Sequence, residues 1–174
     1  ASQLGREIGK RKLRVRVLSA DGYLKPRSDR KAKDLVGGSD TLRLDLLKDH
    51  LEHLNRGETF TPPEYNHLTG EVEAGSPVDP GQLDVIIFEG WPVFAVPELR
   101  DSLDVKVYID LPDMMRFLQR GQRDPSERNY SIDDTLWIFV TSQASEFGPL
   151  VRGQMPSADI VYQPLDHALW FKKG

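Results

Sequence analysis

The stretch Leu83-Asp84-Val85-Ile86-Ile87-Phe88-Glu89-Gly90 contains an unbroken apolar run that ends in a carboxylate and a glycine. Such a run of β-branched and aromatic residues, without alternation, predicts a strand buried on both faces, as in a parallel sheet covered by helices. A carboxylate at the carboxyl end of such a strand lies where α/β folds bind ligands. Glu89 is therefore a candidate site residue; the alternative is a core strand whose last residue only begins a loop.

A second carboxylate, Asp21, also follows a predicted strand. Residues 13–18 alternate between apolar and basic side chains and then become apolar, which suits a strand. Asp21 could instead be a turn residue before Gly22. Two carboxylates that each follow a strand are harder to explain as loop residues than one, so Asp21 joins Glu89 as a candidate.

The length of 174 residues predicts one domain, residues 1–174, and the absence of cysteine excludes disulfides and thiolate metal sites. No apolar run approaches the length of a membrane span, and the polar start is no signal peptide, so we expect a cytoplasmic protein without a membrane partner.

Residues 1–33 carry eleven Lys/Arg against three Asp/Glu, although the net charge is −4. Because the remainder is acidic, a solvated helix face explains this start better than nucleic-acid binding, and we expect no nucleic-acid partner.

The rest of the chain alternates between predicted helices and strands. Residues 41–55 place leucines on one helical face before Gly57, residues 105–110 suit a strand, and Pro112 or Asp113 begins a further helix. Residues 133–147 predict another helix, and residues 158–162 a short last strand. This alternation predicts an α/β fold with a parallel sheet. His50 and His53 lie close together on the first of these helices. They are either a metal-binding pair or solvated surface residues.

Two further groups of side chains are candidates for ligand binding. Residues 61–81 form a Pro/Gly-rich loop or hairpin in which Tyr65, Asn66 and His67 suit hydrogen bonds to a polar organic ligand; the alternative is that Tyr65 packs on the core. Four arginines within thirteen residues suit multidentate phosphate binding: Arg116, Arg120, Arg123 and Arg128. The alternative is a solvated helix face with Asp124 and Glu127 as ion-pair partners. Together with the strand-end carboxylates, the arginines predict Mg²⁺ and phosphate chemistry.

The sequence resembles the P-loop kinases of small metabolites that include uridine kinase, pantothenate kinase and phosphoribulokinase. The segments closest to pantothenate kinase are Val17-Leu18-Ser19-Ala20-Asp21-Gly22-Tyr23-Leu24-Lys25-Pro26 and Pro63-Glu64-Tyr65-Asn66-His67-Leu68. Those closest to uridine kinase are Ile87-Phe88-Glu89-Gly90, Glu98-Leu99-Arg100-Asp101, Val107-Tyr108-Ile109-Asp110, Arg123-Asp124, Glu127-Arg128 and Ser157-Ala158-Asp159-Ile160-Val161. Each motif is weak alone, but their order and spacing cover nearly the whole chain.

The resemblance implies a three-layer fold, a parallel sheet with helices on both faces, and an ATP-dependent kinase that phosphorylates a hydroxyl of a small metabolite. It implies that Asp21 is the general base and, with Glu89, binds Mg²⁺. Tyr23, Tyr65 and His67 would contact the acceptor, and the loop or hairpin 61–81 would be the acceptor site. Arg123 and Arg128 would lie in a lid-like segment, residues 120–131, that closes on the phosphates. The implied partners are the acceptor and a nucleoside triphosphate, in a monomer or a homo-oligomer.

The sequence departs from that family in two places. Uridine kinases carry a histidine a few residues beyond the loop tyrosine, where this chain has Gly70 or Glu71, so nucleoside specificity does not follow. The phosphate loop G-x-x-x-x-G-K-[ST] and the strand before it are also absent from residues 1–174. We therefore expect an N-terminally incomplete kinase domain whose residues 1–174 alone bind MgATP weakly or not at all and show no turnover. The alternative is a non-catalytic, degenerate kinase-fold binding module.

Overall fold

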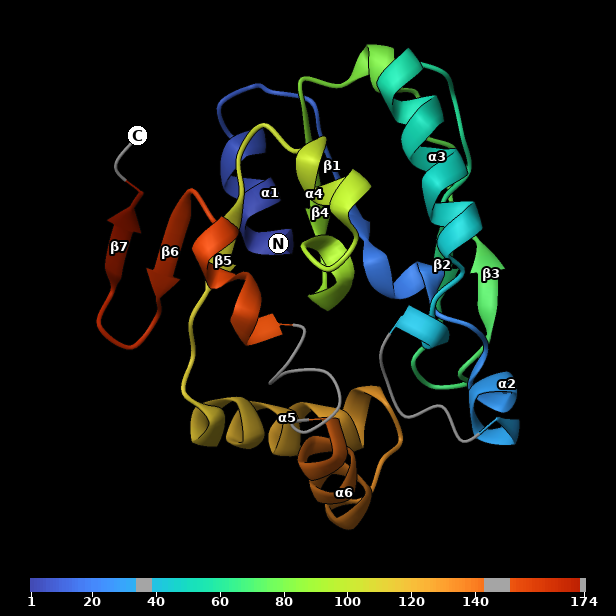
Figure 1. Cartoon of the computed structure of the whole chain (residues 1–174), viewed down its shortest axis with the longest axis vertical. Helices are drawn as coiled ribbons and strands as arrows, with labels where there is room; N and C mark the ends of the chain where they lie inside the picture. Colours follow the sequence, from blue (N-terminus) through green and yellow to red (C-terminus); the bar gives the residue numbers. More distant parts are fainter. Residues whose placement is uncertain (34–38, 143–150, 173–174) are drawn as a thin grey trace. The chain divides into compact units, whose positions relative to one another are not determined.

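The structure, a computed structural model, describes residues 1–33, 39–142 and 151–172 (Figure 1). By its contacts the chain divides into two compact units, of which the first holds residues 1–33 and 39–93 and the second the described residues from 94 onward. No helix within the described ranges is long and apolar enough to cross a bilayer.

The first unit is built on two parallel strands, β1 (Val15–Ser19) and β4 (Val85–Glu89). Their register runs from Val15 opposite Val85 to Ser19 opposite Glu89, so both strands end at the same level. The predicted strand at 85–88 is therefore confirmed. Its predicted burial on both faces is not, because all five β4 residues are only half-buried. Within the described residues β4 pairs with β1 alone, which leaves its other edge without a neighbouring strand.

Helices cover both faces of this strand pair (Figure 1). On one face α1 (Ser2–Gly9) packs so closely that a Cβ atom at Gly5 would lie 3.0 Å from Val17 and 3.8 Å from Ile87. On the other face Leu18 forms a core cluster with Phe60 and Val78. Residues from β4 and from α3 (Leu44–Arg56) pack against that cluster: Ile86, Phe88 and Leu54. This confirms the predicted layer order, helix–sheet–helix.

The helix predicted over residues 41–55 from the leucine spacing is α3, which begins at Leu44 rather than at Thr41. Leu44, Leu47, Leu51 and Leu54 recur every three or four residues, and Leu47 and Leu51 are 0% and 5% exposed. The helix ends as expected at Gly57, whose φ of 69° is left-handed.

Shorter elements connect these parts of the first unit. The 3₁₀ turn η1 (Ala20–Tyr23) follows β1, and the short helix α2 (Arg27–Ala32) comes next, with η2 (Ser39–Thr41) before α3. The region 61–81 contains the hairpin β2 (Pro63–Tyr65) and β3 (Val72–Ala74), which pair antiparallel, and ends in η3 (Pro80–Gln82). The turn η4 (Trp91–Val93) follows β4.

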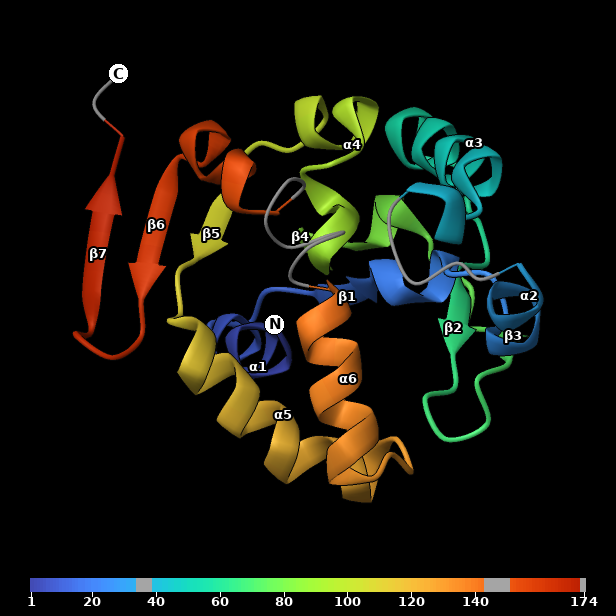
Figure 2. The same ribbon diagram turned by 60° about the horizontal axis from the view of Figure 1, so that its bottom comes forward.

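The second unit holds a three-stranded sheet and two longer helices. Strand β5 (Val107–Ile109) pairs parallel with β6 (Ile160–Gln163), which pairs antiparallel with β7 (Ala168–Phe171), as Figure 2 shows. Helix α5 (Asp113–Glu127) packs on α6 (Ile132–Ser142) through Phe117 and Phe139, whose ring centroids are 5.3 Å apart. The short elements of this unit are α4 (Pro97–Asp101) and η6 (Arg152–Ser157).

Two expectations for the second unit need adjustment. The helix predicted over 133–147 is α6, which begins at Ile132 and ends at Ser142; residues 143–147 lie outside the described residues. Strand β7 was not predicted, because residues 168–171 are few and their side chains do not alternate in polarity.

Candidate active site

Asp21 and Glu89 lie at the same edge of the β1–β4 sheet. Glu89 is the last residue of β4 and pairs in register with Ser19, two residues before Asp21. The two strand ends also touch, since a Cβ atom at Gly90 would lie 3.0 Å from the Cβ atom of Ala20. The structure therefore brings both predicted carboxylates to the carboxyl ends of two adjacent parallel strands, where α/β folds bind ligands.

The turn η1 holds Asp21 at this edge. Ser19 caps the turn, because its hydroxyl accepts a hydrogen bond of 3.4 Å from the Asp21 amide. Gly22, the next residue, is buried so tightly that any Cβ atom there would collide with the main-chain carbonyl of Pro63 in β2. A glycine is required for so close an approach, and it brings Asp21 beside the β2–β3 hairpin.

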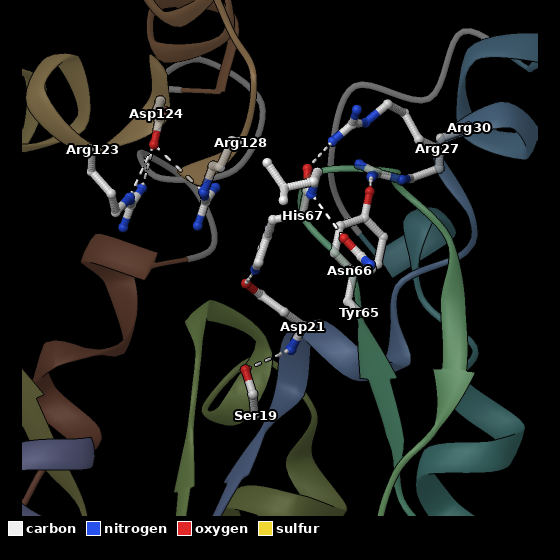
Figure 3. A network of polar contacts seen from close by, with 11 residues as sticks. Ser19, Asp21, Arg27, Arg30, Tyr65, Asn66, His67, Arg123, Asp124 and Arg128 are labelled. Carbon is white, nitrogen blue, oxygen red and sulfur yellow. Dashed lines mark hydrogen bonds and ion pairs between the residues drawn. The ribbon is translucent and has the colours of Figure 1, made fainter. Parts of the chain in front are cut away.

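His67, in the β2–β3 loop (residues 66–71), faces Asp21 (Figure 3). Its Nε2 atom lies 3.5 Å from Asp21 Oδ2, and the two side chains are 33% and 26% exposed. Tyr65, at the end of β2, meets the His67 ring edge-on with ring centroids 5.0 Å apart. Asp21, Tyr65 and His67 therefore form one half-buried polar cluster, so that the predicted base and two of the predicted acceptor-binding residues lie together.

Tyr23 lies away from this cluster. It is 1% exposed, its ring stacks on Phe88 with centroids 6.2 Å apart, and its hydroxyl is 3.0 Å from His50 Nδ1. Burial disfavours the charged form of both side chains, so it raises the pKa of Tyr23 and lowers the pKa of His50. Tyr23 therefore packs in the core in this structure.

The histidine pair on α3 is also accounted for by local contacts. His50 bonds Tyr23, and His53 lies 3.8 Å from Asp49 and 3.9 Å from Glu58. Within the described residues no group of three or more His, Asp or Glu side chains could hold a metal ion. Asp21 and Glu89 remain the candidate ligands, and their oxygen chemistry fits Mg²⁺, which commonly takes one or two carboxylates together with water and substrate phosphates.

In the second unit, three arginines converge on the carboxylate of Asp124, which is 0% exposed (Figure 3 shows two of them). Arg123 Nη2 lies 2.8 Å from Oδ1, Arg120 Nε 3.2 Å from Oδ2, and Arg128 Nε 3.5 Å from Oδ1. Arg123 and Arg128 are thus brought together by a buried carboxylate at the end of α5. Of the two expected acidic partners, Asp124 takes that role, and it is buried rather than solvated.

A sequence model of the phosphoribulokinase/uridine kinase family matches residues 12–169. The chain belongs to this family. It is 36% identical over 153 residues to uridine kinase from Leuconostoc citreum, covering 83% of this chain and 70% of that protein. It is 26% identical over 151 residues to chloroplastic phosphoribulokinase from Chlamydomonas reinhardtii, covering 86% of this chain but only 40% of that protein.

Solved structures of family members share the fold. Phosphoribulokinase from Rhodobacter sphaeroides superposes with a TM-score of 0.67 at 16% identity, over 93% of this chain and 63% of that one. A Bacillus stearothermophilus protein described as a possible uridine kinase superposes with a TM-score of 0.61 at 20% identity, over 92% of this chain and 78% of that one. These similarities confirm the predicted P-loop-kinase-like α/β fold.

Two residues that contact the hairpin, Arg27 and Arg30, were not predicted from the sequence. Both are on α2, and their side chains bond the main chain of His67 and the hydroxyl of Tyr65. Their spacing of three residues, shortly after the Asp21 turn, was the available signal, but it is equally typical of a solvated basic face.

Proposed function

We propose that the protein transfers the terminal phosphoryl group of MgATP to a hydroxyl of a small metabolite. The observation that carries this proposal is the meeting of Asp21 and Glu89 at one sheet edge, with His67 beside Asp21. Membership of a family named for two such kinases supports it. Phosphoryl transfer needs positioning and charge neutralisation more than covalent help, and carboxylates at a sheet edge suit that task.

In the proposed reaction the acceptor hydroxyl lies against Asp21. Its oxygen forms a bond to the γ-phosphorus, its proton passes to the Asp21 carboxylate, and the bond from the γ-phosphorus to the bridging oxygen breaks to release ADP. Glu89 and Asp21 would hold Mg²⁺, which supplies positive charge to the phosphate oxygens. Tyr65 and His67 would bind and orient the acceptor from the β2–β3 loop.

Arg123 and Arg128 are proposed to bind phosphate oxygens. The Arg123 side chain is 40% exposed, so it retains donors for an anion besides those that contact Asp124. Substitution by lysine keeps the charge and removes the planar fork. Arg128→Lys is therefore expected to reduce turnover clearly while the unfolding temperature changes little. A strongly lowered unfolding temperature with turnover retained would assign Arg128 to the ion-pair network alone.

The proposal is tested with Asp21→Asn, in protein that includes any residues its gene encodes before Ala1. ATP turnover is measured with uridine, pantothenate and a pentose phosphate as acceptors, which separates the uridine kinase-like and pantothenate kinase-like alternatives. We expect kcat to fall about 10²-fold or more, the usual scale for loss of a general base. Asp29→Asn, at an exposed residue of α2, is the matched control and should leave kcat unchanged. Near-normal turnover in Asp21→Asn would refute the assignment.

A second variant tests the metal role. Glu89→Gln should raise the Mg²⁺ concentration needed for half-maximal turnover, because it removes a charged oxygen ligand. Binding of an acceptor without any turnover in the wild-type protein would instead favour the non-catalytic binding module.

A further inference from the structure

The β2–β3 loop is held in shape by its own hydrogen bonds. Asn66 Oδ1 accepts from the amides of Leu68 and Thr69 at 3.0 and 3.2 Å, and the Asn66 carbonyl accepts from the Gly70 amide at 2.7 Å. The Asn66 amide donates to the Glu71 carbonyl at 2.9 Å. These bonds set the conformation of the loop, but none of them attaches the loop to the rest of the first unit.

That attachment is made by α2. The Arg27 amide donates to the Gly70 carbonyl at 2.8 Å, and Arg27 Nη2 donates to the His67 carbonyl at 2.6 Å. The contact is close enough that a Cβ atom at Gly70 would lie 2.6 Å from the Cβ atom of Arg27, and Gly70 has a φ of 81°. Arg27 therefore bonds the loop at two points, the carbonyls of His67 and Gly70.

Arg30 bonds the hydroxyl of Tyr65. Its Nη2 atom donates a hydrogen bond of 2.6 Å to Tyr65 Oη (Figure 3). Its Nε atom donates a second bond of 3.1 Å to the Lys25 carbonyl, so the guanidinium is held at two points. Arginine has no acceptor atom, so the phenolic oxygen must accept this bond. The hydroxyl hydrogen of Tyr65 is then left to point elsewhere.

We propose that Arg27 and Arg30 are positioning residues for the phosphate acceptor, and that Arg30 makes Tyr65 a hydrogen-bond donor toward an acceptor oxygen. This inference rests on the proposed function. A hydroxyl that already accepts a charged bond has its hydrogen available, so Tyr65 selects ligands that offer a carbonyl, hydroxyl or ether oxygen at that point. Arg27, by holding His67, keeps the imidazole beside Asp21.

A double-mutant cycle of Arg30→Met and Tyr65→Phe tests the role of Arg30, with the acceptor that gives turnover in the wild-type protein. Each single variant should raise the acceptor KM roughly tenfold, as for loss of the hydrogen bond from the Tyr65 hydroxyl to the acceptor. The kcat and the KM for ATP should change less than about twofold. Because Arg30 acts through the Tyr65 hydroxyl, the double variant should be no worse than Tyr65→Phe alone. Arg30→Lys, which keeps a donor, should recover part of the loss, and Arg11→Met on an exposed arginine is the control.

Additive effects in this cycle would overturn the inference, because Arg30 would then act on the ligand or the fold independently of Tyr65. Equal increases in the KM for ATP and for the acceptor would overturn it as well. Absence of turnover with every acceptor, in wild-type protein that includes any residues its gene encodes before Ala1, would instead overturn the proposed function, and with it the role of the loop in acceptor binding. Turnover with an additive cycle refutes only the present inference, so the two failures are distinguishable.

Hydrogen exchange tests the role of Arg27 without any substrate. Arg27→Met should speed amide exchange in residues 66–71 about tenfold or more, while the amides of β1 and β4 keep their protection. Unchanged exchange in the β2–β3 loop would overturn the positioning role of Arg27.

Discussion

Replacing Asp124 by asparagine should strongly destabilise the second unit, because the Asp124 carboxylate is 0% exposed and lies under three guanidinium groups. The amide keeps one oxygen and turns the other acceptor into a donor, so at least one charged hydrogen bond is lost, at about 1.5–3 kcal/mol. Breaking a buried ion pair usually costs about 3–5 kcal/mol because the remaining charge is left without a partner. The arginines are 21–40% exposed, so water partly compensates them. We therefore expect a loss of about 3 kcal/mol.

The assay is denaturant unfolding followed by fluorescence and circular dichroism, with a thermal scan in parallel. For a chain of this length the expected loss corresponds to a decrease in Tm of about 10 °C. Glu127→Gln is the matched control: it makes the same chemical change on the same helix, at an exposed residue, and should alter stability by less than about 0.5 kcal/mol. Equal, small effects of the two variants would refute the reasoning, since they would show that the arginines do not depend on the buried carboxylate.

Three further predictions concern the first unit. Burial lowers the pKa of His50, so the unfolded chain takes up a proton on His50 at a higher pH than the folded chain does. Tm should therefore fall as the pH drops from about 6.5, the usual pKa of histidine, toward the lowered pKa of His50. His50→Gln should flatten this part of a pH–Tm profile. Hydrogen bonds from Arg14 lower the pKa of Asp84 to about 2, so an NMR titration of the carboxyl carbon should show a midpoint there in the wild type and near the usual value of about 3.9 in Arg14→Met. Gly22→Ala should cost about 1–3 kcal/mol in a denaturant titration, because the methyl group meets a main-chain carbonyl of β2, whereas Gly9→Ala, with open space around it, should not destabilise.

The elements that could be predicted well from the sequence are those whose signals are local. The leucine spacing and Gly57 together indicate both the burial and the end of α3, and the apolar run 85–88 indicates β4. The meeting of Asp21 and Glu89 was also predictable, since parallel strands present their carboxyl ends at one edge.

Features that depend on tertiary contacts were not predictable in this way. Tyr23 follows Asp21 closely enough to suggest a shared site, but only the packing of Phe88 and His50 shows that its ring is buried. Likewise, no spacing rule shows that Asp124 is enclosed while nearby Glu127 is exposed. The contacts of Arg27 and Arg30 join residues 35–40 positions apart in the chain, which a local pattern does not encode.

The register of β1 with β4 also bears on how the protein folds. The two strands pair residues 70 positions apart, from Val15 with Val85 onward, so pairing must close a loop of that length. For a flexible chain that closure costs roughly 4 kcal/mol in entropy beyond a length-independent constant, and it comes before any stabilising contact between the strands forms. Asp21 and Glu89 are neighbours only after this step. Any intermediate held together by local helices alone, such as α3, therefore lacks the paired carboxylates. A ligand that needs both carboxylates cannot bind such an intermediate and so cannot speed the folding of the protein.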